Sequence, residues 1–258
     1  MKILVCIKQV PDTTDIKWTE NNTIQREGVE SIINPYDVYA LENALRLKKT
    51  HHAHVSVITM GPNQAEDMLR KTIAVGADDA ALLTDRKFAG ADTYATGKTI
   101  ATAIQNKYPD YDLIICGQFA IDGDTAQTGP TIANNLNIPQ VTYVKEIVEA
   151  TCDYIIVKRE IEEGTEILKV TLPALICVLK GHEEPVRPKI DGIIKSQNAQ
   201  ITFLSLEDIG LAPEHAGLKG SPTYVSRAFR PQSKGQCVYV TSCDELCKKL
   251  EEFDIIND

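Results

Sequence analysis

The residues best suited to bind a ligand lie between positions 117 and 130, where glycines, carboxylates and hydroxyls separate an apolar run from a helical pattern. Backbone N–H groups and the hydroxyls of Thr125 and Thr128 could hold a phosphate there, while Asp122 or Asp124 could reach a ribose hydroxyl. The same residue types also form turns and cap helices. Residue types alone therefore leave a nucleotide site and a plain capped turn equally open.

The elements that must position this run follow an alternating pattern. Short Val/Ile-rich runs alternate with helical patterns over the first 140 residues, which predicts βαβ units and a doubly wound, mostly parallel, Rossmann-like α/β sheet. Strands are expected near 2–8, 54–60, 80–84, 112–117 and 140–147, with helices from 34, over 64–75 and over 93–107. Ligands bind beyond the carboxyl ends of strands in such a sheet, which selects the loops 8–13, 60–62 and 117–130.

The second half of the chain shows other patterns. The runs 154–159 and 166–170 predict an antiparallel hairpin, 174–179 a further strand, 16–25 a small surface hairpin and 243–253 a terminal helix. Residues 181–235 hold 6 of the 15 glycines and 5 of the 12 prolines, which predicts a linker or an arm that folds on a partner. We therefore divide the chain into an α/β domain over 1–190 and an extended C-terminal arm with a terminal helix over 191–258.

Composition excludes several function classes. A net charge of -9 without a basic block argues against nucleic acid and anionic membrane surfaces. No apolar run reaches the roughly 18 residues of a membrane span, and no secretion signal is visible. Seven cysteines, an odd number, lie partly in strand-like runs without a Cys-x-x-Cys pair. We expect reduced cysteines, a cytoplasmic location and no metal site.

Familiar catalytic and nucleotide motifs are missing as well. The chain has neither G-x-G-x-x-G after the first strand nor G-x-x-x-x-G-K-[ST], and no nucleophile and base pair is readable. Helix caps explain Asn34 and Asp37, and also the group Asp92, Thr93 and Thr96, as readily as ligand contacts do. Any redox role therefore needs a bound cofactor, because the chain has no redox group of its own that these motifs would indicate.

Five segments resemble a known family in order along the chain: 2–13 (KILVCIKQVPDT), 34–37 (NPYD), 60–62 (MGP), 76–78 (GAD) and 117–127. A longer signature runs through Val157, Arg159, Glu162 to Gly164, Glu166, Leu168, Pro173 and Leu175 to Cys177. With these segments, the chain resembles the β subunit of electron-transfer flavoproteins over essentially its whole length.

The resemblance implies an obligate heterodimer with an α subunit, which the C-terminal arm embraces, and a pocket of adenine-nucleotide type. The pocket falls on the loops that the sheet rule selected. The cofactor-binding positions implied by the resemblance and the loops together are Cys6, Lys8, Pro11, Asp12, Thr13, Asn34, Asp37, Met60, Asp92, Thr93, Thr96, Gly117, Gln118, Ala120, Asp122, Gly123, Asp124, Thr125, Ala126, Gln127, Thr128 and Arg159. Arg159 stands in a charged hairpin, where it is either a solvated ion-pair residue or a cation near a flavin.

The resemblance also implies a recognition loop for a partner flavin dehydrogenase of acyl-CoA or hydroxy-acid type. It covers 184–194, with Ile190 at the anchoring position and further contacts from Glu184, Pro185, Arg187 and Ile193. Val186-Arg187 departs from the Arg-Tyr that is more frequent in the family.

The family has two branches, which differ in what the β subunit holds. One holds AMP as a structural element and shuttles electrons from a dehydrogenase; the other holds a second FAD, takes electrons from NADH and divides them between ferredoxin and a dehydrogenase. Gly123 and Ala126 stand where the AMP branch tends to carry Asp and Asn, and small side chains leave space for a larger ligand. We expect the bifurcating branch, with NADH oxidation only within the complex. AMP in place of this FAD, or a purely structural AMP-binding module, is the alternative.

Overall fold

A nine-stranded sheet forms the centre of the computed structural model, which describes residues 1–12, 31–181, 185–226, 237 and 239–253. The strand order is β11-β5-β4-β1-β6-β10-β7-β8-β9. The strands are β1 (Lys2–Cys6), β4 (His54–Met60), β5 (Asp79–Leu83), β6 (Leu113–Gly117), β7 (Gln140–Ala150), β8 (Tyr154–Ile161), β9 (Gly164–Thr171), β10 (Ala174–Val178) and β11 (Thr202–Leu204). Pairing is parallel from β11 to β7 and antiparallel between β7, β8 and β9, so the predicted mostly parallel sheet and the hairpin are confirmed.

Helices cover both faces of this sheet, as expected for a doubly wound fold. The helices are α1 (Pro35–His51), α2 (Glu66–Val75), α3 (Thr93–Lys107), α4 (Thr128–Leu136), α5 (Ile190–Asn198), α6 (Gly217–Gly220) and α7 (Cys243–Glu252), with 3-10 turns η2 (Asn63–Ala65), η3 (Arg86–Phe88) and η4 (Pro213–His215). The helices expected from 34, over 64–75 and over 93–107 are therefore confirmed as α1, α2 and α3, and the terminal helix as α7.

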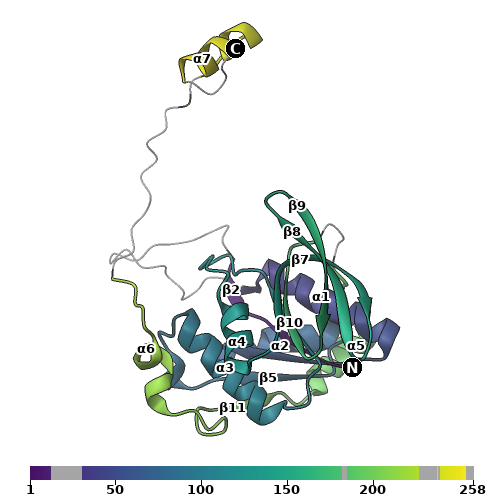
Figure 1. The fold of residues 1–258 in the computed structure, drawn as a ribbon. Coiled ribbons are helices and arrows are strands. Elements are labelled where there is room, and N and C mark those ends of the chain that lie inside the picture. Colours follow the sequence, from purple (N-terminus) through teal and green to yellow (C-terminus); the bar gives the residue numbers. More distant parts are fainter. Residues whose placement is uncertain (13–30, 182–184, 227–236, 238, 254–258) are drawn as a thin grey trace.

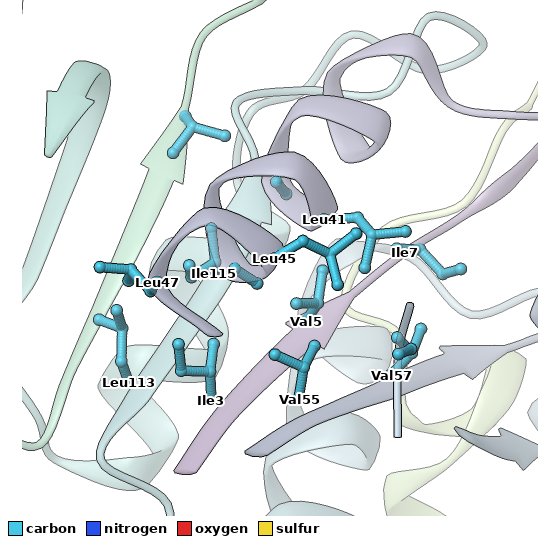
Figure 2. Close-up of a cluster of buried hydrophobic side chains, with 14 of the residues drawn as sticks. Ile3, Val5, Ile7, Leu41, Leu45, Leu47, Val55, Val57, Leu113 and Ile115 are labelled. Atoms are coloured by element: carbon cyan, nitrogen blue, oxygen red, sulfur yellow. The ribbon is translucent and has the colours of Figure 1, made fainter. Parts of the chain in front are cut away.

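Alternation along the central strand builds a core on each face. Ile3 and Val5 of β1 pack with Leu41 and Leu45 of α1, as Figure 2 shows. Leu4, the residue between them, belongs to the second core beneath α3 and α4. Because successive strand residues point to opposite faces, the continuous apolar run at positions 3–7 serves both cores.

The segment after residue 190 differs from the prediction of a linker or partner-binding arm over 181–235. β11 pairs in parallel with β5, α5 packs against α2, and α6 packs against α3. Leu206, Ile209, Leu211 and Ala216 are buried in the core beneath α3. The short apolar runs build no core of their own, but they extend one that the sheet has already formed, so the prediction is wrong over 190–220.

A second, two-stranded antiparallel sheet pairs β2 (Gln9–Pro11) with β3 (Ser31–Ile33). The surface hairpin expected over 16–25 lies outside the described residues. β1 and β6 are neighbours whose following connections lead to opposite sides of the sheet, through α1 to β4 and through α4 to β7. Their carboxyl ends form the topological switch point, the place where open α/β sheets bind ligands.

Candidate functional site

Two buried polar side chains join the loops at the switch point. Asp37 Oδ2 accepts a hydrogen bond of 2.7 Å from the amide of Lys8, and Oδ1 accepts one of 3.1 Å from the amide of Gly117. Asn34 Nδ2 donates to the carbonyl of Phe119 at 2.9 Å, and its Oδ1 accepts from the amide of Ile121 at 3.2 Å. Asp37 therefore ties the end of β1 to the end of β6, and Asn34 fixes the loop that follows.

These two residues hold backbone rather than present their side chains at the surface. Asn34 is 1% exposed and Asp37 is 6% exposed. Asn34 occupies the N-cap position of α1 as predicted, but its side chain makes no capping hydrogen bond and bonds the 119–121 backbone instead. Burial raises the pKa of Asp37 to about 7, although hydrogen bonds from Asn34, Lys8 and Gly117 act in the opposite direction.

The loop between β6 and α4 opens toward solvent beside these anchors. Asp124 and Ala126 adopt left-handed conformations with φ of 48° and 55°, and a Cβ at Gly123 would meet no atom within 4 Å. The N-cap residue Gln127 makes no side-chain capping bond, so the first amides of α4 keep no partner of that kind. An uncapped helix start preceded by a loop of this shape suits an anionic group such as a phosphate.

Two glycine contacts fix the start of α4 against its neighbours. A Cβ at Gly129 would lie 2.4 Å from Cys177 Sγ of β10, and a Cβ at Gly97 of α3 would lie 2.5 Å from Thr131 Cγ2. Both distances are shorter than real Cβ contacts. The absence of a side chain at these positions therefore lets α4 approach the sheet and α3 closely.

Three buried thiols form the floor beneath this site. Cys6, Cys116 and Cys177 pair in register on the adjacent strands β1, β6 and β10. Hydrogen bonding to Cys116 and burial raise the pKa of the Cys177 thiol well above its ordinary value. Protonated thiols of this kind pack as small hydrophobic groups, and all seven cysteines of the chain are free, as predicted.

A hollow of about 380 Å³ opens on the β7 side of the loop. Four of its lining residues, Gln118, Ala126, Gln127 and Arg159, are among the predicted cofactor-binding positions. The others were not predicted: Pro130, Gln140, Thr142 and Tyr143. The volume lies within the range of about 300–1,000 Å³ typical of small-molecule sites.

Two interactions shape the walls of this hollow. Gln118, which is 2% exposed, accepts a hydrogen bond of 2.6 Å from the amide of Tyr143 through Oε1, and Tyr143 has a φ of 58°. Arg159 donates from Nε and Nη2 to Glu166 Oε2, at 2.8 and 2.7 Å. The guanidinium is thus held at the rim by a carboxylate of the neighbouring strand, which is the ion-pair reading of Arg159; its role as a cation near a flavin stays a prediction.

On the opposite side of the loop, Lys8 Nζ forms an ion pair of 2.6 Å with Asp122 Oδ1. Met60 ends β4, Pro11 ends β2, and Asp12 follows directly. Thr13 lies outside the described residues. Ala120 accepts hydrogen bonds from the amides of Gly123 and Asp124 and so closes a turn.

The predicted group at the start of α3 is used within the chain. Asp92 Oδ1 accepts from the amide of Ala95 at 2.9 Å, and Oδ2 accepts from the amide and hydroxyl of Thr223 at 3.0 and 2.7 Å. Desolvation acts against these hydrogen bonds, yet together they leave the pKa of Asp92 below its ordinary value. Thr93 and Thr96 lie in the first turn of the same helix, which packs against α4.

The predicted partner-recognition residues lie at and before α5. Ile190 and Ile193 are 77% and 42% exposed, and Pro185 and Arg187 precede the helix. Glu184 lies outside the described residues. An exposed apolar helix face of this kind is typical of a protein interaction site.

The described residues contain neither a cluster of metal ligands nor a helix that could span a membrane. In that part of the chain, no three or more His, Cys, Asp or Glu side chains are grouped to hold a metal ion. Nor does any helix there have the length and apolar character that crossing a membrane requires.

Comparisons with known proteins agree with this architecture. The family model described as the electron transfer flavoprotein domain matches residues 21–208. The chain is 49% identical to the electron transfer flavoprotein subunit beta of Thermoanaerobacterium thermosaccharolyticum, over 91% of this chain and 90% of that protein. It is 46% identical to the caffeyl-CoA reductase-Etf complex subunit CarD of Acetobacterium woodii, over 99% and 100%, and 45% identical to protein FixA of Rhizobium meliloti, over 92% and 83%. The chain therefore belongs to the electron transfer flavoprotein family, as a β subunit.

Proposed function

We propose that this chain, paired with an α subunit, carries electrons between NADH, ferredoxin and a partner flavin dehydrogenase by flavin-based electron bifurcation. In this proposal the β-subunit pocket holds FAD, with NAD(H) as the substrate that reduces it. When bound, a flavin accepts hydride from a nicotinamide and exchanges electrons with other centres. NADH oxidation is expected only within the assembled complex.

The observation that carries the proposal is the space around the 123–126 loop. Gly123 has no neighbour within 4 Å of a Cβ, and Ala126 lines the hollow of about 380 Å³. A structural AMP needs contacts for one phosphate and one nucleoside, whereas FAD needs room beyond its adenylate half. Small residues on the side of the hollow supply that room and support the larger ligand.

In this proposal the residues of this chain bind the cofactor and hold the loop that surrounds it. The start of α4, which lacks a side-chain cap, and the hydroxyls of Thr125 and Thr128 would bind the pyrophosphate, and Asp122 or Asp124 would bind a ribose hydroxyl. Asn34 and Asp37 keep the loop backbone in place. Arg159, at the rim of the hollow, places positive charge beside the ligand.

The partner is proposed from the relatives and from the exposed isoleucines of α5. CarD is named as part of a complex with caffeyl-CoA reductase, and it covers almost this whole chain. A flavin dehydrogenase of acyl-CoA type is therefore the favoured partner, with a hydroxy-acid type as the alternative. The C-terminal segment of the proposed 191–258 arm contains α7, which exposes Leu246 and is followed directly by the exposed Phe253. We propose that this segment packs on the α subunit and that the heterodimer is cytoplasmic.

The competing proposal keeps the fold and changes the ligand. In it, the pocket holds AMP, the α subunit holds the only flavin, and the complex shuttles electrons from a dehydrogenase without NADH.

The first experiment coexpresses both subunits, purifies the heterodimer without oxygen, denatures it and counts the released FAD and AMP by chromatography. Two FAD without AMP support bifurcation and predict flavin reduction by NADH. One FAD with one AMP would overturn it.

A substitution at Ala126 tests the same point from the protein side. Asn tolerates a left-handed φ, so Ala126→Asn adds bulk to the hollow without straining the backbone. We expect the variant to lose β-subunit FAD while still binding added AMP. His52→Asn, at a left-handed position of φ 50° that ends α1, is the matched control and should keep wild-type FAD content.

A further inference from the structure

The partner-recognition helix α5 is built with its apolar side outward. Ile190, Ile193 and Ile194 are 77%, 42% and 54% exposed, whereas the buried contact with α2 is made by small residues. A Cβ at Gly192 would lie 2.1 Å from the carbonyl oxygen of Ala74, and Ser196 is 6% exposed. The burial of large side chains, which normally stabilises a surface helix, therefore contributes little to holding α5 in place.

A nine-residue helix of this composition needs another source of order, because short helices are marginal in water. Arg70 of α2 supplies it. Arg70 Nη1 donates to the carbonyls of Ser196, Gln197 and Ala199 at 2.6, 3.3 and 3.1 Å. These are carbonyls at the end of α5, where the backbone lacks intrahelical donors and favours a cation.

Arg70 is itself held in position from its own helix. Glu66 Oε1 accepts from its Nε and Nη2 at 3.0 and 2.7 Å. The side chain of Arg70 is 31% exposed, so these charge-assisted bonds are partly shielded from water. Glu66, Arg70 and the end of α5 thus form one continuous polar connection beside the close Gly192 contact.

We propose that Arg70 and Gly192 are positioning residues that hold α5 as a preformed docking helix for the partner flavin dehydrogenase. The inference rests on the proposed function, since it assumes that α5 meets a dehydrogenase. Ordering the helix before the encounter removes an entropic cost that binding would otherwise carry. Arg70 does not line the hollow, and its hydrogen bonds reach Glu66 and the carbonyls at the end of α5, so its loss weakens docking and leaves the flavins unchanged.

The test compares Arg70→Met with wild type in the purified αβ heterodimer, using an FAD-containing dehydrogenase of acyl-CoA type as the electron acceptor. We expect KM for the dehydrogenase to rise about tenfold, equivalent to about 1.4 kcal/mol, while kcat and the FAD content stay the same. Arg70→Lys, which keeps the charge but loses the planar fork, should fall between the two. Lys71→Met, on the adjacent exposed position of α2, is the matched control and should leave KM unchanged.

A second measurement reports on α5 without a partner. Amide hydrogen exchange over 193–198 in the heterodimer should be faster in Arg70→Met and in Gly192→Ala than in wild type. Wild-type KM in a correctly folded Arg70→Met heterodimer, or unchanged exchange, would overturn the proposal. If the wild-type heterodimer itself reduces no dehydrogenase, the proposed function fails and the docking role fails with it, whereas the exchange result separately decides whether Arg70 orders α5.

Discussion

The amide of Lys8, at the end of β1, donates a hydrogen bond of 2.7 Å to Asp37 Oδ2 and is therefore already used within the chain. Because Oδ1 of the same carboxyl group accepts from Gly117, Asp37 occupies the two amides at the ends of β1 and β6. A ligand phosphate cannot use these amides as well. The geometry therefore directs an anionic group to the open start of α4, where the first turn has no side-chain cap.

Asp37 should give the protein a measurable pH dependence. Its pKa is raised from 3.8 to about 7 in the folded chain, so the folded state binds the proton more tightly than the unfolded state does. The protonated carboxyl group of Asp37 therefore stabilises the folded state relative to the ionised one by about 4 kcal/mol in total. This stabilisation is complete below about pH 4 and is lost as the pH rises to about 7. In Asp37→Asn, the free energy of unfolding should no longer show this dependence on pH. Urea unfolding of the heterodimer between about pH 5 and about pH 8 measures it. Asp124→Asn, an exposed carboxylate on the same edge, is the control, and an unchanged slope in Asp37→Asn would contradict the assignment.

The ion pair between Lys8 and Asp122 should contribute little to ligand affinity. The two side chains are 49% and 15% exposed, and such pairs contribute about 0.2–1 kcal/mol. Lys8→Met should therefore weaken nucleotide binding less than about fivefold, and added salt should reduce the difference. Lys2→Met, which removes an ion pair with Asp110 at 3.2 Å, is the control in a titration calorimetry series. A loss of about a hundredfold would instead mean that Lys8 contacts the ligand directly.

The sequence predicts the central sheet well because each parallel strand is a nearly continuous apolar run. The same logic fails for β11, whose three residues, Thr202–Leu204, form a strand only because β5 offers them an edge. Burial of Ile209 and Leu211 depends likewise on a core built by residues far away in the chain. No local pattern carries that information.

The candidate site divides in a similar way. Loop positions such as Gly123 and Ala126 are predictable because strand ends and small residues can be read locally. Tyr143 is not, since its left-handed conformation stands on a non-glycine residue in a strand and its partner, Gln118, lies 25 residues away. The burial of Asp37 is equally hidden, because a carboxylate in a first helical turn normally signals a solvated charge.

Glu166 should compete with an anionic ligand for Arg159. Its Oε2 accepts two bonds, at 2.8 and 2.7 Å, from the guanidinium at the rim of the hollow. Glu166→Gln removes the negative charge and should tighten nucleotide binding about threefold, while Arg159→Met should weaken it by at least as much. Equilibrium dialysis of the nucleotide-free heterodimer measures both. Equal affinities in the two variants would show that Arg159 lies outside the ligand's reach.

The close contact between Gly129 and Cys177 should be visible as coupling between two substitutions. Gly to Ala inside a helix ordinarily stabilises by roughly 0.5–1 kcal/mol, but a Cβ at Gly129 would lie 2.4 Å from Cys177 Sγ. Gly129→Ala should therefore lower the free energy of unfolding by about 1–3 kcal/mol and also reduce nucleotide content, because α4 must move away from the sheet.

Cys177→Ala removes the sulfur and should restore part of both losses in the double variant, with a coupling of about 1–2 kcal/mol in urea unfolding. Gly123→Ala, where the added methyl group meets no atom within 4 Å, is the control for the free energy of unfolding. Strict additivity of the two single changes would show that α4 is positioned by other contacts, of which the approach of Gly97 to Thr131 is the next to test.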